Sequence, residues 1–140
     1  MLATLTLVAL LAGVPFHTVT KGDGGASTIG KRSNLTIKSA SRWADVWTGL
    51  GEQGRPRRVD FSRSMVVAVT EARQVSGGRD IKIERIDRVG SGYVVQAVET
   101  SPGRGCFTPS VITRPYHAVR VPRIAGKVSF AVRRKVVEEC

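Results

Sequence analysis

Apolar residues follow two different periods along this chain, and the helical period occurs in one short segment. Residues 39–51 read SASRWADVWTGLG, and their large apolar residues fall at i, i+3, i+4 and i+7, on one face of a helix: Trp43, Val46, Trp47 and Leu50. Residues suited to cap such a helix stand at both ends: Ser39 or Ser41 first, then Gly49 or Gly51. The pattern predicts one amphipathic helix over residues 40–50.

Most of the remaining chain alternates between apolar and polar residues, as half-buried strands do. PFHTVTKGDGGASTIGKRSNLTIKS reads as two extended segments around a glycine-rich connection. The unbroken apolar run Met65–Val69 indicates a strand that is buried on both faces and therefore lies centrally in its sheet. Residues 79–99 carry two alternating runs around DRVGSG and predict a hairpin.

The last two predicted strands lie around residues 117–121 and 128–132, with Pro122 and Gly126 between them. Strands joined by short turns, with one helix near the start, predict an α+β domain. The expected sheet is mainly antiparallel, has about seven strands, and is curled or split into two layers. We expect the helix to pack on this sheet through its two tryptophans.

A chain of 140 residues is long enough for one domain with a core of its own. We assign residues 14–140 to a single domain and residues 1–13 to a leader. The apolar stretch Leu2–Val14 has the length of a signal-peptide core but lacks a basic start and a clear cleavage site. An N-terminal strand, or a start codon inside a longer signal, is the alternative. No apolar run is long enough to span a bilayer.

The net charge of +11 and the pI of about 10.8 favour contact with acidic partners. Basic residues cluster in sequence only at 55–58 and 133–135, and no aromatic residues interleave with them as base-stacking platforms. Binding of nucleic acid or of another polyanion, such as an acidic cell-surface polymer, is therefore kept as the alternative function.

The chain has two cysteines, Cys106 in GRGCFTPS and Cys140. In an oxidising compartment they could pair and close a loop, whereas two buried or free thiols are the other interpretation. A thiol enzyme would require Cys106 and His117 to meet an orienting acid, and nothing in their spacing brings them together. The two histidines, His17 and His117, lack metal-site spacing and are interpreted as satisfied or surface imidazoles.

Two glycine-rich stretches resemble phosphate loops without meeting their requirements. Residues 25–31 match G-x-x-x-x-G-K, but Arg32 replaces the hydroxyl residue that would hold magnesium, and a strand pattern follows instead of a helix. A flexible hairpin loop is the better interpretation there. In QVSGGRDIKI, Gly77 and Gly78 indicate a turn that requires a positive φ. The sequence therefore offers no catalytic, cofactor or metal site and no evident small-molecule substrate.

Several segments, in this order and spacing, resemble the C-terminal domain of the protease complex subunit PrcB. They are VDFSRSMVVAV, the glycine pair followed by IKI, TSPGRGC and ITRPYHAVRVPR. Upstream, a small-residue loop, a strand and a Trp-containing helix also resemble the family, so that the likeness covers residues 16–132. In the family a G-x-R-x-x-G pattern and then an aromatic residue are usual. Here Glu71 replaces the first glycine and Arg79 the aromatic residue, whereas Arg73 and the glycine pair remain.

The resemblance implies a bacterial, exported domain without catalytic activity, whose namesake accompanies and stabilises a subtilisin-like surface protease. We therefore expect a non-enzymatic, protein-binding module in the periplasm, at the cell surface or secreted. The loops around residues 73–79 and 102–115 are the candidate contact surface, because loops on a rigid sheet commonly carry recognition. The candidate contact residues are Arg73, Gly77, Gly78, Arg79, Arg104, Arg114 and Tyr116.

Overall fold

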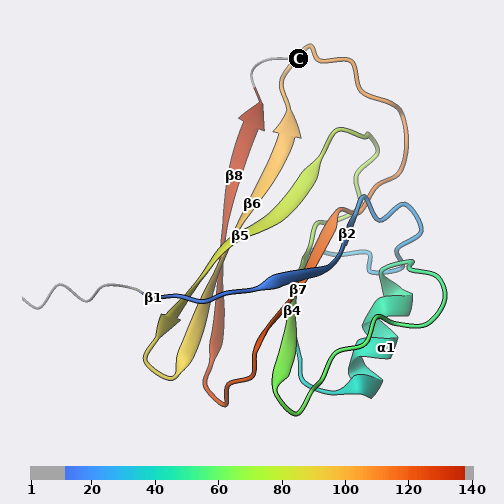
Figure 1. The fold of residues 1–140 in the computed structure, drawn as a ribbon. Coiled ribbons are helices and arrows are strands. Elements are labelled where there is room, and N and C mark those ends of the chain that lie inside the picture. The colour runs from blue at the N-terminus through green and yellow to red at the C-terminus, as the bar shows by residue number, and fades with distance from the viewer. Residues whose placement is uncertain (1–11, 138–140) are drawn as a thin grey trace, which may run out of the picture.

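The computed structural model describes residues 12–137 and shows two β-sheets and one helix (Figure 1). The elements in chain order are β1 (Ala12–Gly13), β2 (His17–Gly22), β3 (Ser33–Ile37), α1 (Ala40–Gly49), β4 (Ser64–Thr70), β5 (Asp80–Val89), β6 (Gly92–Pro102), β7 (Tyr116–Pro122) and β8 (Val128–Val137). The predicted leader lies outside the described residues except for the two that form β1. No helix in the described range is both long and apolar enough to cross a membrane.

The strands form two four-stranded sheets. Sheet A has the order β1-β5-β6-β8, and sheet B has the order β2-β7-β4-β3. Every pairing is antiparallel except that of β6 with β8, which runs parallel from Tyr93 opposite Val128 to Pro102 opposite Val137. The predicted α+β fold, with a mainly antiparallel two-layer sheet, is confirmed.

The molecule has three layers, with sheet A on one side, sheet B in the middle and α1 on the far face of sheet B (Figure 1). Met65, Val67 and Val69 of β4 face sheet A, and Val66 and Ala68 face the helix. All five side chains are fully buried. This two-sided burial explains the unbroken apolar run, and it confirms the central position predicted for this strand.

Helix α1 forms where its period predicts it. The Ser39 side chain caps it by accepting a hydrogen bond from the backbone N–H of Arg42, at 3.2 Å. Gly51 follows the helix with φ +82°, a conformation that glycine adopts without a side-chain clash. Trp43 and Trp47 pack edge to face, 5.7 Å apart, and both are buried against sheet B.

The hairpin predicted over residues 79–99 is formed by β5 and β6, with an irregularity in register between Ile83 and Arg85. The glycine-rich loop at residues 25–31 is not a hairpin loop, because β2 and β3 lie at opposite edges of sheet B with β7 and β4 between them. The turn at Gly78 does have a positive φ, +82°, as predicted. It leads from β4 in sheet B to β5 in sheet A, and so it crosses between the layers.

Candidate functional site: a charged cavity and two paired loops

Along four strands, the series of apolar residues that face the core is followed by a charged residue. The four charged residues lie at the same end of the sandwich. Successive core-facing residues of a strand are two positions apart. Continuing each series by two positions from the apolar core leads to a charged residue: Val69 to Glu71, Ile81 back to Arg79, Ala97 to Glu99, and Val132 to Arg134. The apolar core thus gives way to a polar cluster between the sheets.

These residues line a cavity of about 340 Å³, which we call the inter-sheet cavity. Its lining comes from the segment before β3, the segment that joins β4 to β5, and the ends of β6 and β8: Arg32, Glu71, Gln74, Arg79, Glu99, Thr100, Ser101, Arg134 and Val136. Three arginines and two glutamates make it the most densely charged of the described cavities. It can hold a polar ligand of small size.

Glu99, unlike Glu71, is ion-paired in this cavity, with Arg32 and Arg134. Its two carboxylate oxygens meet the two terminal nitrogens of Arg32, at 2.8 and 2.9 Å, and the Nε of Arg134 lies 3.5 Å from Oε2. A two-pronged contact of this kind is among the stronger ion pairs in proteins. The Glu99 side chain is thus buried against two arginines.

Glu71 is also buried, with 1% of its surface exposed, but its carboxyl makes no hydrogen bond or close ion pair with any described residue. Burial, with a smaller contribution from the nearby charge of Glu99, raises the pKa of Glu71 to about 7. Arg79 and Arg32 oppose this shift. At neutral pH this carboxyl can thus exchange a proton.

Arg79 is the second group with unused bonding capacity. Its Nε is buried without a hydrogen-bond partner, and its guanidinium forms no ion pair with the described residues. Gln74, in the same lining, donates from Nε2 to the carbonyl oxygen of Ala72, at 3.2 Å. The cavity thus contains a carboxylate and a guanidinium that are not joined to each other.

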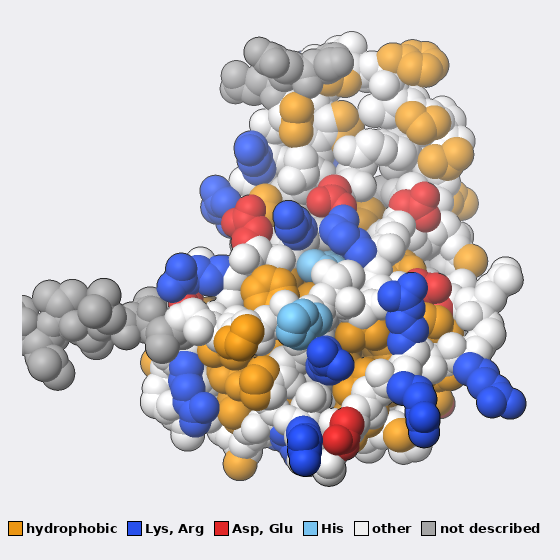
Figure 2. Space-filling view, in the orientation of Figure 1, with side chains coloured by type: hydrophobic (Ala, Val, Ile, Leu, Met, Phe, Trp, Pro, Cys, Tyr) orange, Lys and Arg blue, Asp and Glu red, His pale blue; other side chains and the backbone are white. Residues whose placement is uncertain are grey.

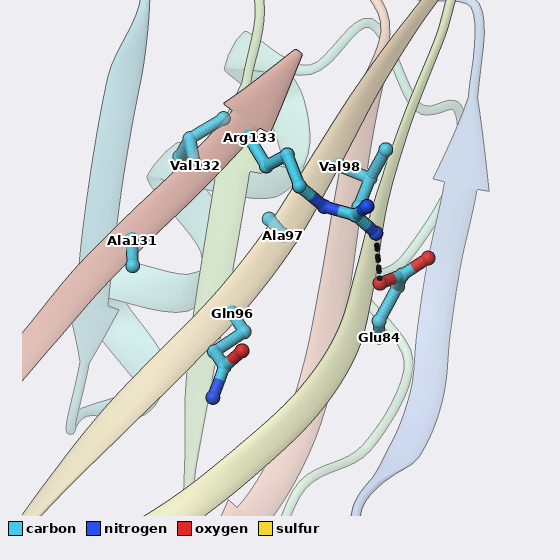
Figure 3. Close-up of a pocket in the computed structure, with 7 residues that line it drawn as sticks. All are labelled: Glu84, Gln96, Ala97, Val98, Ala131, Val132 and Arg133. Atoms are coloured by element: carbon cyan, nitrogen blue, oxygen red, sulfur yellow. Dashed lines mark hydrogen bonds and ion pairs between the residues drawn. The ribbon is translucent and has the colours of Figure 1, made fainter. Parts of the chain in front are cut away.

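A second cavity, of about 240 Å³, lies over sheet A and offers a contrast (Figure 3). Its lining includes Gln96, Ala131 and the pair Glu84 and Arg133. Figure 3 shows Arg133 extended toward Glu84, and its Nη2 lies 3.1 Å from the carboxylate. We call this the outer-face cavity, and its acid and base already satisfy each other in solvent.

The loop that contains Gln74 and Arg79 lines the inter-sheet cavity, and it is bound to the loop that follows β6. Gln74 and Thr113 exchange two backbone hydrogen bonds, at 2.7 and 3.0 Å, and the Gly77 N–H donates to the carbonyl of Pro109 at 2.9 Å. A Cβ on Gly77 would lie 2.8 Å from the Pro109 ring, so this close approach needs glycine. The two loops predicted as a contact surface therefore form one structural unit.

This loop unit exposes large apolar side chains. Phe107 is 99% exposed and Val75 is 70% exposed, and Val111 and Ile112 are about half exposed. We call these four residues the apolar loop patch. Figure 2 shows hydrophobic side chains exposed at this end of the molecule. Next to Phe107, Cys106 is disulfide-bonded, and its predicted partner Cys140 lies outside the described residues.

The other candidate contact residues occupy different environments. Arg73 and Arg104 are exposed on the two loops. Arg114 instead donates from Nη1 to the carbonyl of Ser27, at 2.6 Å, and thereby ties its loop to the segment after β2. Tyr116 is buried and donates its hydroxyl to Glu52, and burial is the main cause that raises its pKa to about 12. Partner contact by these residues remains a prediction.

His117 lies inside the sandwich and uses both ring nitrogens. Nδ1 accepts a hydrogen bond from the Ile83 N–H at 2.9 Å, and Nε2 lies 2.8 Å from the Thr18 hydroxyl. Burial lowers the pKa of His117 to about 4. His17 is exposed, so both histidines fit the interpretation as satisfied or surface imidazoles. Within residues 12–137, no group of three or more His, Cys, Asp or Glu residues could hold a metal ion.

Comparison with known proteins bears on this same region. Residues 65–122 match the family model described as PrcB C-terminal, which confirms the resemblance over the segment from β4 to β7. Neither a curated protein nor a solved structure matches the chain. The two positions that depart from the family pattern, Glu71 and Arg79, both line the inter-sheet cavity.

Sequence reasoning identified Arg79 but missed the other charged residues of the cavity. The alternation of inward-facing and outward-facing residues along each strand would have identified them. Glu99 and Arg134 continue the alternating series of core-facing apolar residues in their strands, and Glu99 is buried there. This alternation is visible in the sequence. The sequence does not show that the charged residues from four segments lie around one cavity.

Proposed function

We propose that this chain is an exported, non-enzymatic binding module that associates with another protein, as an accessory or stabilising subunit of a surface protease complex. The observation that carries the proposal is the apolar loop patch: Val75, Phe107, Val111 and Ile112. A large aromatic side chain that is almost fully exposed on a bonded pair of loops is typical of a protein contact. The family match over residues 65–122 supports association with a protein.

The chemistry around the apolar loop patch suits a partner with an apolar recess and an acidic rim. Arg73 and Arg104 are exposed on the same two loops, and the whole chain carries a net charge of +11. Such charges steer an acidic partner toward the surface, while the apolar side chains provide the affinity. Glycine contacts and backbone hydrogen bonds hold the loops in place, which lowers the entropic cost of binding.

Export and the absence of catalysis are parts of the same proposal. The apolar segment Leu2–Val14 and the disulfide-bonded Cys106 are typical of proteins in oxidising compartments. Both nitrogens of His117 are engaged in structural hydrogen bonds, which supports a role without acid–base chemistry.

The test is affinity copurification of the tagged chain from the envelope fraction of its host, with washes at low and high salt. We expect a stoichiometric protein, such as a protease, that survives high salt and is lost when Phe107→Asp is used as bait. Val89→Asp is the matched control, because Val89 is also exposed but lies in the β5–β6 hairpin, away from the loops. Equal retention by both variants would contradict the proposal.

The alternative, polyanion binding, predicts the opposite response to salt. Contacts with nucleic acid or an acidic polymer release counterions, so high salt would remove the partner whichever apolar residue is changed. Figure 2 shows basic side chains spread among acidic ones on the face in view, without a continuous stripe. Arg133 and Arg134, in the basic run of β8, contact Glu84 and Glu99.

A further inference from the structure

The Glu71 carboxyl has unused hydrogen-bonding capacity inside the inter-sheet cavity. It is 1% exposed, it lines the cavity, and Oε2 has no hydrogen-bond partner. A buried carboxylate oxygen without a donor is costly, so it favours a partner such as a water, an ion or a ligand. Burial, and to a smaller extent the charge of Glu99, raises the pKa of Glu71 to about 7. The site therefore lacks a hydrogen-bond donor or a cation beside Glu71.

The Arg79 guanidinium lacks a hydrogen-bond acceptor, just as Glu71 lacks a donor. It lines the same cavity, its Nε is buried without a partner, and no described carboxylate pairs with it. Arg134 also faces the cavity, and its side chain, 75% exposed, contacts Glu99 only at 3.5 Å. Two guanidinium groups are thus available to an anion at the open side of the cavity.

A ligand that gives Glu71 a donor and Arg79 an acceptor must carry two kinds of group. It needs an anionic group for Arg79 and Arg134, and a donor a few bonds away for Glu71. The neutral part of the lining, which includes the hydroxyls of Thr100 and Ser101, suits a small polar ligand. A volume of about 340 Å³ lies at the lower end of the range for small-molecule sites, which are roughly 300 to 1,000 Å³.

We propose that the inter-sheet cavity binds a small molecule with a carboxylate next to an ammonium or hydroxyl group, the chemistry of an α-amino acid or an α-hydroxy acid. The carboxylate accepts hydrogen bonds from Arg79 and Arg134. The ammonium or hydroxyl group donates to Glu71. Arg32 remains on Glu99 and keeps that carboxylate from competing for the ligand. This site is separate from the apolar loop patch and does not depend on the proposed protein partner.

The first test uses wild-type protein and four small probes with the same three-carbon skeleton. Alanine and lactate carry both required groups, propionate carries the anion alone, and alaninamide carries the cation alone. Each is titrated into isotopically labelled protein, and the NMR signals of Glu71, Arg79 and Thr100 are followed. We expect alanine or lactate to shift these signals saturably, and each single-group probe to bind about tenfold more weakly or worse, because one charged contact is missing. Whether alanine or lactate binds better identifies the donor as ammonium or hydroxyl.

The second test uses paired variants. Glu71→Gln and Arg79→Gln should each weaken binding by about tenfold or more, since each removes one charged contact of the ligand. Glu84→Gln and Arg133→Gln are the matched controls, because this acid and base line the outer-face cavity and pair with each other. They should leave the affinity unchanged. A fall in the pKa of Glu71 when alanine binds would confirm the contact with its ammonium group.

Three results would overturn the proposal. In the first, none of the four probes shifts the signals of the cavity at tens of millimolar. In the second, all four bind equally, which would show that the paired groups do not select the ligand. In the third, an experimental structure of the ligand-free protein has Glu71 and Arg79 joined in a direct ion pair. The loss of a protein partner in Phe107→Asp would affect none of these results, so the two proposals can fail separately.

Discussion

The inter-sheet cavity and the outer-face cavity contain the same kinds of side chain and put them to different use. Over the outer face of sheet A, Glu84 and Arg133 meet at 3.1 Å in solvent and form a direct ion pair. Between the sheets, Glu71 and Arg79 line one cavity without meeting. Exposed side chains can move until they pair, whereas buried ones are held where the packed strands place them. Glu71 and Arg79 are therefore held apart, and each keeps a buried polar atom without a hydrogen-bond partner.

The largest expected difference between the two cavities is the effect of removing an arginine. Arg32→Ala should lower the free energy of unfolding by about 3 to 4 kcal/mol, because it leaves the buried Glu99 carboxylate without its two-pronged partner. Arg133→Ala should cost under about 1 kcal/mol, because its pair with Glu84 is exposed. Urea denaturation at neutral pH measures both, and equal losses would contradict the comparison.

The next effect concerns His117, a buried polar group whose partners are complete. Its pKa falls from the ordinary 6.5 to about 4 in the folded state, so the unfolded state binds the proton more tightly. The resulting stability is fully present above about pH 6.5 and is lost by about 3 kcal/mol as the pH falls toward 4. His117→Gln should lack this loss.

Unfolding measured from pH 7.5 to pH 4 in both proteins tests the role of His117. The quantity compared is each protein's change with pH relative to its own stability at pH 7.5, so a general loss of stability in the variant does not affect the result. Parallel curves would show that His117 does not carry the response.

Glu71 should respond to pH in the opposite sense and by a similar amount. Its pKa rises from 4.5 to about 7 on folding, so the folded state binds the proton more tightly. Stability is therefore lost as the pH rises from about 4.5 to 7, and Glu71→Gln should stabilise the protein by about 3 kcal/mol at pH 8 but hardly at pH 4. Glu84→Gln should change stability by less than about 0.5 kcal/mol at either pH. Thermal unfolding at the two pH values tests this, and a stabilising effect at pH 4 would contradict it.

The smallest expected effect lies in the apolar loop patch. Phe107→Ala should change the free energy of unfolding by less than about 0.5 kcal/mol, because the ring is 99% exposed and contributes little burial. The same variant should lose its protein partner in copurification. A large loss of stability would instead indicate that the ring packs against the protein in solution.

The sequence predicted the features of the fold that depend on a single helix, strand or turn. The tryptophan helix, the doubly buried strand β4 and the β5–β6 hairpin all follow from local period and local turns. The hairpin expected at residues 25–31 was wrong, because the neighbours of β2 and β3 are supplied by distant segments. The parallel pairing of β8 with β6 was missed for the same reason.

The candidate site also has parts that the sequence predicted and parts that it did not. Its loops were identified from glycine, proline and arginine positions, and the structure shows that they are bonded to each other. The convergence of Glu71 and Glu99 was not predicted, since it depends on how two sheets are stacked and where each strand ends.

The sequence by itself determined which residues face inward, because alternation and helical period are properties of neighbours along one strand or helix. It also determined that four inward series end in a charge. Only the tertiary structure decided that these four ends meet around one cavity, that Arg32 reaches Glu99, and that Glu71 and Arg79 remain apart. The physical reason is that charge pairing depends on distances of a few ångströms between segments far apart in sequence, and these distances are set only when the sheets pack.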